Sequence, residues 1–206
     1  MAVRSRPGVY LASASPRRKE LLDQLGIAHR VIRVSVDESP RPGEAPAALA
    51  CRLAVAKAER GLAELGAGAA GVVLGADTIV VSDVAMLGKP RDAAAAEEML
   101  ARLSGRTHEV LSAVALAAPS VATAVRLSTS RVRLRAIGAA ERRAYCATRE
   151  PLDKAGGYAI QGRAAAFVEH LEGSYSGVMG LPLSETAALL SAAGVEVFVA
   201  ERPGDA

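Results

Sequence analysis

Hydrophobic and polar residues alternate along the 206-residue chain with two different periods. Residues 9–12 and 71–81 are apolar runs that predict strands. The second run, broken only by an Asp-Thr pair, is typical of a strand buried on both faces. Residues 107–116 alternate strictly enough to predict another strand, whereas residues 47–65 repeat their apolar positions at helical spacing. Strands and helices in alternation predict an α/β fold.

Turn and capping residues place the other elements. Ser15 is a good N-cap, Pro16 suits the first helical position and Gly26 is a natural stop, so we expect a helix between them. The apolar pattern changes phase near Ser130, as it would at a β-bulge. The remaining predictions are strands at 30–37, 125–134 and 195–199, helices at 92–103, 139–147 and 184–193, and a loop at 39–46.

Length and composition indicate an ordinary globular protein. Half of the residues are hydrophobic and 23% are charged, a balance that excludes wholesale disorder. A chain of this length can bury about 70% of its unfolded surface, so a core can form without staples. Because no internal repeat or low-complexity linker divides the sequence, we expect a single domain over 1–206, with 1–8 and 201–206 flexible.

Charge narrows the possible partners. The net charge is +3, and two windows are clearly basic: residues 1–33 carry seven Arg or Lys against two acids, and residues 126–143 carry six against one. Each is either a solvated face or a site for phosphates. Aromatic residues make up only 3%, which argues against binding single-stranded nucleic acid by base stacking. Duplex binding through the basic windows is an alternative that no DNA-binding motif supports.

The cysteines and the N-terminus predict a cytoplasmic protein. Cys51 and Cys146 are far apart and lack zinc-ligand spacing, so reduced thiols are expected. The basic N-terminal residues are not followed by the apolar stretch of a signal peptide. The longest uncharged run, 110–125, is shorter than a membrane span.

The start of the first predicted helix is a candidate phosphate site. Arg17 and Arg18 occupy its opening turn, where cations are unfavourable by about 0.3–1 kcal/mol each at low salt. Two arginines beside Ser13 and Ser15 suit a bound anion that supplies the missing negative charge. The alternative is that both arginine side chains point into water.

Asp77 is the second candidate, because a carboxylate inside an apolar strand must be paired, hydrogen-bonded or metal-bound. A purely structural Asp77 is the alternative. Glu38 ends an earlier predicted strand, and Lys57 and Lys89 are available to balance phosphate charge. Two carboxylates, Glu38 and Asp77, suffice for a Mg²⁺ that takes its other ligands from water and substrate phosphates. No Walker A, GxGxxG, GxSxG or HExxH motif occurs.

Seven short motifs follow one another from residue 9 to about 190. They are Leu11-Ala12-Ser13-Ala14-Ser15-Pro16-Arg17-Arg18, Val36-Asp37-Glu38, Ala76-Asp77-Thr78, Leu87-Gly88-Lys89-Pro90, Leu103-Ser104-Gly105-Arg106-Thr107-His108, Tyr158-Ala159-Ile160-Gln161-Gly162 and Gly180-Leu181-Pro182-Leu183. In order and spacing this series resembles the Maf family of nucleoside triphosphate pyrophosphatases. Ser112-Ala113 and Met179 depart from common family residues, and neither change threatens the site.

The resemblance implies an elongated, two-lobed α/β fold related to the inosine triphosphatases, with a mixed central sheet and the site in a cleft. It also implies metal-dependent hydrolysis, with Mg²⁺ or Mn²⁺, of a nucleoside triphosphate to the monophosphate and pyrophosphate. Asp77 matches the family's proton acceptor, and Glu38, Lys57 and Lys89 match its other charged cleft residues. Arg17, Thr78 and Gln161 match the positions that determine base preference in the family. This combination of residues is similar to that of the branch acting on dTTP and UTP.

Three alternatives accompany this interpretation. The first is a non-catalytic nucleotide sensor that regulates cell division, which would bind nucleotide without turnover. The second, within the enzyme class, is a preference for modified nucleotides. The third concerns assembly, since the sequence is compatible with a monomer or a homodimer. Ser13 and Arg18 are also expected to bind the substrate, at its phosphates. The expected partner is a nucleoside triphosphate rather than nucleic acid or a membrane.

Overall fold

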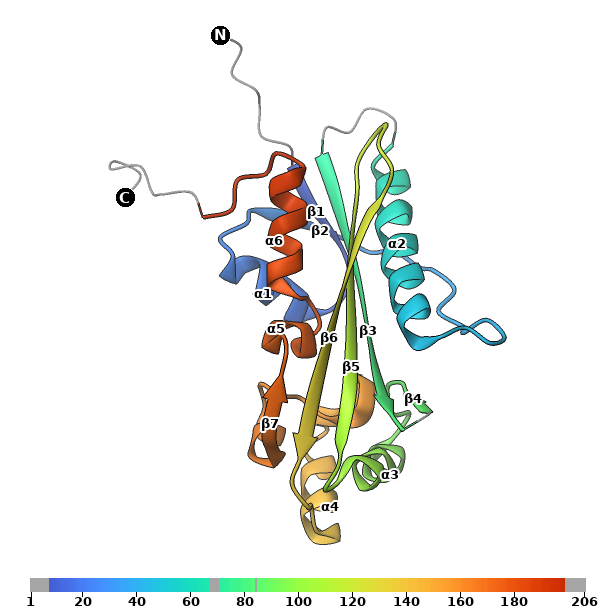
Figure 1. Cartoon of the computed structure of the whole chain (residues 1–206), viewed down its shortest axis with the longest axis vertical. Helices are drawn as coiled ribbons and strands as arrows, with labels where there is room; N and C mark the ends of the chain where they lie inside the picture. The colour runs from blue at the N-terminus through green and yellow to red at the C-terminus, as the bar shows by residue number, and fades with distance from the viewer. Residues whose placement is uncertain (1–7, 67–70, 84, 199–206) are drawn as a thin grey trace.

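The computed structural model describes residues 8–66, 71–83 and 85–198. The ends expected to be flexible lie outside these ranges, apart from Gly8, which begins strand β1 and pairs with Gly71. The described chain is elongated, and three long strands run along most of its length (Figure 1). Among the described residues, no helix is both long and apolar enough to cross a bilayer.

One mixed sheet forms the centre of the protein. Its strand order is β2-β1-β3-β5-β6-β7, and β4 pairs with β3 off this path. Strand β1 is parallel to β2 and β3, whereas β3, β5, β6 and β7 pair antiparallel in succession. The strands are β1 (Gly8–Ala12), β2 (His29–Ile32), β3 (Gly71–Ser82), β4 (Ala85–Leu87), β5 (Thr107–Ala117), β6 (Ala124–Leu134) and β7 (Val168–Glu172).

Helices cover both faces of this sheet. In Figure 1, α1 and α6 lie on one side of the long strands and α2 lies on the other, while α3 and α4 gather at the opposite end of the molecule. The helices are α1 (Pro16–Gln24), α2 (Pro46–Leu65), α3 (Ala93–Leu103), α4 (Ala139–Ala147), α5 (Tyr175–Met179) and α6 (Leu183–Ala192), with short 3₁₀ turns η1 (Glu150–Asp153), η2 (Ala155–Gly157) and η3 (Arg163–Phe167).

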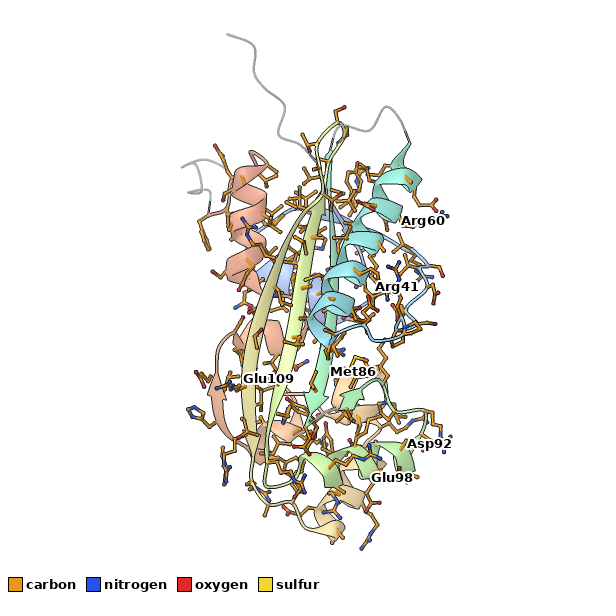
Figure 2. All side chains as sticks on the ribbon, turned by 45° about the vertical axis from the view of Figure 1, so that its right-hand side comes forward. Arg41, Arg60, Met86, Asp92, Glu98 and Glu109 are labelled. Carbon is orange, nitrogen blue, oxygen red and sulfur yellow. The ribbon has the colours of Figure 1, made fainter. Side chains whose placement is uncertain are left out.

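The buried side chains divide the molecule into two lobes. The α2 lobe contains β1, β2, α1, α2 and α6, with one apolar cluster on each face of the sheet. The α3 lobe contains β4, α3, α4, β7 and the 3₁₀ turns around a separate cluster that includes Leu100 and Leu134. In Figure 2, Arg60 marks the α2 lobe, Glu98 marks the α3 lobe, and Met86 lies between them. The predicted α/β fold with a mixed sheet and two lobes is confirmed.

A glycine on β3 sets the distance between the sheet and α2. A Cβ atom at Gly75 would overlap the backbone of Ala54 and Ala58. Helix α2 therefore packs directly on the backbone of β3. This close packing brings Lys57 of α2 within hydrogen-bond distance of Asp77 on β3. The sequence pattern predicted both elements but not this close approach.

Two strand predictions differ from the structure, and two observed strands were not predicted. Strand β2 ends at Ile32 rather than at residue 37, because its partner β1 ends opposite it at Ala12. The strands β4 and β7 were not predicted, since β4 has only three residues and β7 has only two apolar residues among its five. Residues 195–198 form no strand although Val195 is buried in the core, and residue 199 lies outside the described residues.

The bulge expected near Ser130 is also wrong. Ser130 faces Val110 in an unbroken β5–β6 register, whereas the pairing of β6 with β7 shifts between Arg133 and Leu134. The apolar pattern changes phase because the covered face changes: Val125 packs on the α2 cluster, whereas Leu134 packs in the α3 lobe.

Candidate active site

Asp77 lies near the middle of β3 and is 9% exposed. Its Oδ1 atom accepts a hydrogen bond from Nζ of Lys57 on α2 at 2.7 Å, and the same Nζ lies 2.6 Å from Oε1 of Glu38. The ammonium compensates a carboxylate that could not be buried unpaired. Partial burial opposes ionisation of Glu38, but the hydrogen bond and charge of Lys57, aided by Lys89 and Arg18, lower the pKa of this carboxyl.

Arg18 is anchored by three protein oxygens. Its Nε donates to the carbonyl of Gly180 at 2.7 Å, Nη1 donates to Oγ of Ser13 at 3.2 Å, and Nη2 donates to Oγ1 of Thr78 at 3.5 Å. Burial lowers the pKa of the guanidinium, and the nearby Asp77 opposes this shift. An arginine remains protonated even so, and the site therefore contains a fixed positive charge.

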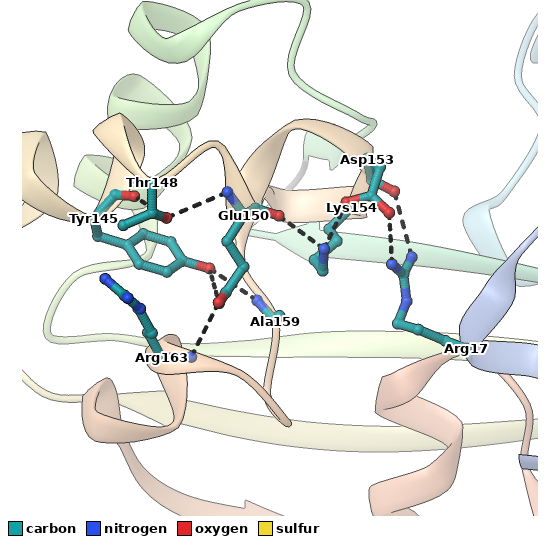
Figure 3. A network of polar contacts seen from close by, with 8 residues as sticks. All are labelled: Arg17, Tyr145, Thr148, Glu150, Asp153, Lys154, Ala159 and Arg163. Atoms are coloured by element: carbon teal, nitrogen blue, oxygen red, sulfur yellow. Dashed lines mark hydrogen bonds and ion pairs between the residues drawn. The ribbon is translucent and has the colours of Figure 1, made fainter. Parts of the chain in front are cut away.

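Arg17 reaches across to the other lobe. Its Nη1 donates to Oδ2 of Asp153 at 2.7 Å, and its Nη2 donates to the carbonyl oxygen of the same residue at 3.3 Å (Figure 3). Lys154 contacts the other carboxylate oxygen at 2.5 Å. Although burial opposes the shift, Lys154 and Arg17 together lower the pKa of Asp153 to about 2. Helix α1 and turn η1 are thus joined by an ion pair at the mouth of the site.

These side chains line a cleft of about 530 Å³, a size that suits a small ligand. Every candidate residue from the sequence analysis lines it except Ser13, which lines an adjoining depression of about 380 Å³ together with Arg17 and Lys89. Gln161 is exposed in the cleft, and its side-chain amide has no hydrogen-bond partner among the described residues. The predicted site residues therefore meet in one place, with Gln161 free to contact a ligand.

The family described as "Maf-like protein" matches residues 8–193. The chain belongs to the Maf-like protein family. This confirms the resemblance that the seven motifs indicate.

Curated relatives of this Maf-like protein share one name. A protein of Alkalilimnicola ehrlichii named dTTP/UTP pyrophosphatase is 54% identical over 188 residues, which cover 90% of this chain and 92% of the relative. A protein of Bordetella parapertussis with the same name is 53% identical over 197 residues, covering 93% and 95%. A third, from Nitrosomonas europaea, is 48% identical over 200 residues, covering 92% and 96%.

One solved structure shows a weaker likeness. It is titled as a nucleoside-triphosphatase / dITP/XTP pyrophosphatase from Mycobacterium abscessus and overlaps with a TM-score of 0.39 at 19% identity, covering 63% of this chain and 75% of that one. A likeness at this level is too weak to bear on the expected relation to the inosine triphosphatases.

In the Maf-like protein, Thr78 belongs to a chain of hydrogen bonds. Oγ of Ser112 donates to the carbonyl of Gly177 at 2.5 Å and lies 2.9 Å from Oγ1 of Thr78. Because Ser112 has a single hydroxyl proton, Thr78 donates to it and accepts from Arg18. The Ser112 hydroxyl thus supports Arg18 through Thr78.

The Maf-like site offers two carboxylates to a divalent metal. Among the described residues, no group of three or more His, Cys, Asp or Glu side chains could hold an ion. Glu38 and Asp77 converge on one ammonium and would act as a pair of ligands. Mg²⁺ commonly takes one or two carboxylates and completes its shell with water and phosphates. The pair therefore fits a cation that binds together with a triphosphate.

Two functional groups were missed by the sequence analysis. The carbonyl of Gly180 holds Arg18, and a backbone oxygen leaves no mark in a side-chain pattern. Asp153 holds Arg17 from the charged segment that precedes the Tyr158 motif. The charged residues at 149–154, close before this motif, were the available sign of a functional segment. Nothing in the sequence indicated that one of them would pair with a residue of α1.

The basic window at 126–143 is a solvated face whose charges are largely paired. Four of its six arginines lie near a carboxylate, and the pairs are Arg131–Glu109 at 3.6 Å, Arg133–Glu169 at 2.9 Å, Arg135–Glu141 at 2.8 Å and Arg143–Glu97 at 3.9 Å. The positive charge of this window is therefore partly compensated within the fold.

Proposed function

We propose that this Maf-like protein hydrolyses dTTP and UTP to the monophosphate and pyrophosphate. The observation that carries the proposal is the hydrogen-bonded group formed by Asp77, Lys57 and Glu38. This group lines the same cleft as Gln161, whose side-chain amide has no hydrogen-bond partner among the described residues. The shared name of three relatives, which are 48–54% identical over at least 90% of this chain, supports it. A cytoplasmic location accords with the two free cysteines, since that compartment keeps thiols reduced.

Positive groups at the cleft suit a triphosphate. Arg18 is anchored in place, and Lys89 has no ion-pair partner among the described residues. Helix α1 has no acidic residue in its first turn, so its N-terminal amides and dipole also favour an anion. Phosphoryl transfer depends mostly on positioning and on such electrostatic stabilisation. The phosphates therefore belong at the α1 end of the cleft.

Asp77 is placed to act on water. Its Oδ1 is taken by Lys57, while its Oδ2 has no hydrogen-bond partner in the described part of the chain. In the proposed reaction a water oxygen bonds to the α-phosphorus and its proton passes to Asp77. The bond from the α-phosphorus to the bridging oxygen of the β-phosphate breaks, and pyrophosphate leaves with that electron pair. Lys57 keeps the carboxylate oriented throughout.

Glu38 and Asp77 would hold a Mg²⁺ or Mn²⁺ ion against the phosphates. Such an ion supplies charge neutralisation when bound. The low pKa of Glu38 keeps this carboxyl in the charged form that a metal requires.

Gln161 would contact the base. Its amide offers one donor and one acceptor, which match the O4 and N3–H edge of uracil or thymine. Guanine presents O6 and N1–H in a similar order, so hydrogen bonding alone does not exclude purines. The position of Gln161 relative to the buried Ile160 and Tyr158 beside it then decides which ring fits.

Pyrophosphate release from a panel of canonical and modified triphosphates, with and without Mg²⁺ or Mn²⁺, tests the proposal. We expect dTTP and UTP to be turned over fastest and only with metal. Nucleotide binding without turnover would instead support the non-catalytic sensor. Faster turnover of a modified pyrimidine would assign the same chemistry to a different substrate.

A further inference from the structure

Gln161 lies in a tight turn whose backbone sets the position from which its side chain extends into the cleft. The carbonyl of Ala159 accepts from the N–H of Gly162 at 3.0 Å, and the carbonyl of Gly162 accepts from the N–H of Ala165 at 3.0 Å. Since the Gln161 side chain has no partner among the described residues, any shift of the turn moves the amide directly.

Two side chains hold this turn from outside the cleft. The N–H of Ala159 donates to Oη of Tyr145 at 3.2 Å, and the N–H of Arg163 donates to Oε2 of Glu150 at 3.2 Å (Figure 3). Oη of Tyr145 donates to Oε1 of Glu150 at 2.9 Å. Both carboxylate oxygens of Glu150 therefore accept bonds that lead to the turn, one on each side of Gln161.

Gly162 makes room for this carboxylate. A Cβ atom at Gly162 would overlap Oε1 of Glu150 and would lie 2.6 Å from Cδ. The backbone of Glu150 is itself held, because its N–H donates to Oγ1 of Thr148 at 3.2 Å and its carbonyl accepts from Nζ of Lys154 at 2.8 Å. The carboxylate thus lies against the turn on a fixed support.

Tyr145 has the protonation state that this arrangement requires. Burial raises the pKa of its phenol, and the bond to Glu150 raises it further, against a smaller opposite effect from the Ala159 N–H. The phenol therefore stays protonated, donates to Glu150 and accepts from Ala159. Its ring is also fixed, since it packs edge-on against Phe167 with the ring centres 5.5 Å apart.

We propose that Glu150 and Tyr145 are positioning residues that set base selectivity by holding the Gln161 turn. Neither side chain lines the cleft, so both act through the turn rather than on the ligand. The inference rests on the proposed function, in which Gln161 contacts the base.

The decisive variant is Glu150→Gln, because glutamine keeps the shape but has only one acceptor oxygen. Its NH₂ group must face either the Arg163 N–H, which then loses its acceptor, or the Tyr145 hydroxyl, whose proton then loses its acceptor. Tyr145→Phe removes the hydroxyl that joins the Ala159 N–H to Glu150 and keeps the ring. Glu169→Gln is the matched control, since Glu169 pairs with Arg133 on the surface and does not contact the turn.

Kinetics should separate positioning from chemistry. In Glu150→Gln and Tyr145→Phe we expect the KM for UTP to rise about tenfold, with kcat within about twofold, because a hydrogen bond is lost away from the reacting atoms. The ratio of kcat/KM for UTP over GTP should fall about tenfold, and Glu150→Asp, which keeps two acceptors, should restore part of it. An unchanged ratio in both Gln and Phe variants would overturn the proposal.

Amide hydrogen exchange of the nucleotide-free protein tests the same arrangement without any activity. Exchange across residues 158–165 should be about tenfold faster in Glu150→Gln and Tyr145→Phe, unchanged in Glu169→Gln, and unchanged across α2 in all three. Unaltered exchange at 158–165 would also overturn the proposal. If the wild-type protein releases no pyrophosphate, the proposed function fails separately, and the Kd values for UTP and GTP by calorimetry then decide whether these residues set selectivity.

Discussion

Nε of Arg18 lies 2.7 Å from the carbonyl oxygen of Gly180, so the helix that opens the site is tied directly to the turn before α6. The same guanidinium contacts Ser13 and Thr78. Three bonds in different directions need the planar fork of an arginine, which a lysine ammonium cannot reproduce.

Arg18→Lys should therefore lower kcat/KM for UTP by about 10- to 100-fold, the range for losing charged hydrogen bonds. The matched control is Arg60→Lys, since Arg60 pairs with Glu64 on the outer surface of α2 (Figure 2). Steady-state kinetics check both variants. A wild-type kcat/KM in Arg18→Lys would mean that charge alone matters at this position.

Asp77→Asn should lower kcat by about 10²–10⁴-fold, the usual contribution of a general base. Nucleotide binding should persist, because the phosphates are held mainly by the arginines and Lys89. Single-turnover kinetics and calorimetry with a non-hydrolysable triphosphate measure the two effects. Asp83→Asn is the control, since Asp83 pairs with Arg106 on the surface just after β3. Normal turnover in Asp77→Asn would remove Asp77 from the catalytic role.

Asp153→Asn should lower the KM for UTP by about twofold to fivefold and leave kcat unchanged. The Asp153 carboxylate competes with phosphate for Arg17, and exposed ion pairs are worth about 0.2–1 kcal/mol. The effect should shrink at high salt, as it does for exposed charges. A raised KM would show instead that Asp153 holds Arg17 in its substrate-binding position.

His108 should make folding stability depend on pH between about 6.5 and 4. It is 2% exposed, its Nε2 lies 2.8 Å from Oη of Tyr158, and burial lowers its pKa to about 4. The unfolded chain binds a proton in this window that the folded chain does not, so stability is full above pH 6.5 and falls as the pH drops. The loss is at most about 3 kcal/mol.

Urea unfolding of the wild type and of His108→Gln across pH 7 to 4.5 measures this effect. The variant should lose most of the slope above pH 4.5. Carboxyls such as Glu44 and Glu141, whose pKa values fall from 4.5 to about 2, contribute stability that is lost only at lower pH. An equal slope in wild type and variant would contradict the assignment to His108.

Gly75→Ala should lower the free energy of unfolding by about 1–3 kcal/mol, the cost of overpacking. The added methyl would force α2 away from β3 and move Lys57 from Asp77, so activity should fall as well. Calorimetric Tm values and kcat report the two effects. Gly138→Ala is the control, because the nearest atom to its Cβ would be Oε2 of Glu141 at 3.8 Å.

The sequence predicted the fold class, most helices and a set of polar residues that the fold brings together at one cleft, because periodicity and motifs record burial and chemistry. It could not show the Gly75 contact with α2 or the Arg18 bond to Gly180, since both involve backbone atoms. The end of a strand also depends on its partner. The alternation of polar and apolar residues continues after Ile32, but β2 ends there because β1 ends opposite it at Ala12. The support of Gln161 by Glu150 joins elements that share no local pattern.

Strands β3, β5 and β6 pass from the α2 lobe into the α3 lobe without interruption (Figure 1). Asp77 stands on β3 between the two lobes, with Ala113 of β5 opposite it in the register. Rotating one lobe against the other would bend this paired ladder and strain its hydrogen bonds, so the sheet acts as a stiff spine rather than a hinge. The paired strands therefore hold Asp77 in one place between the lobes, and adjustment to a ligand is left to residues of the cleft that lie off the sheet, such as Arg17 and Gln161.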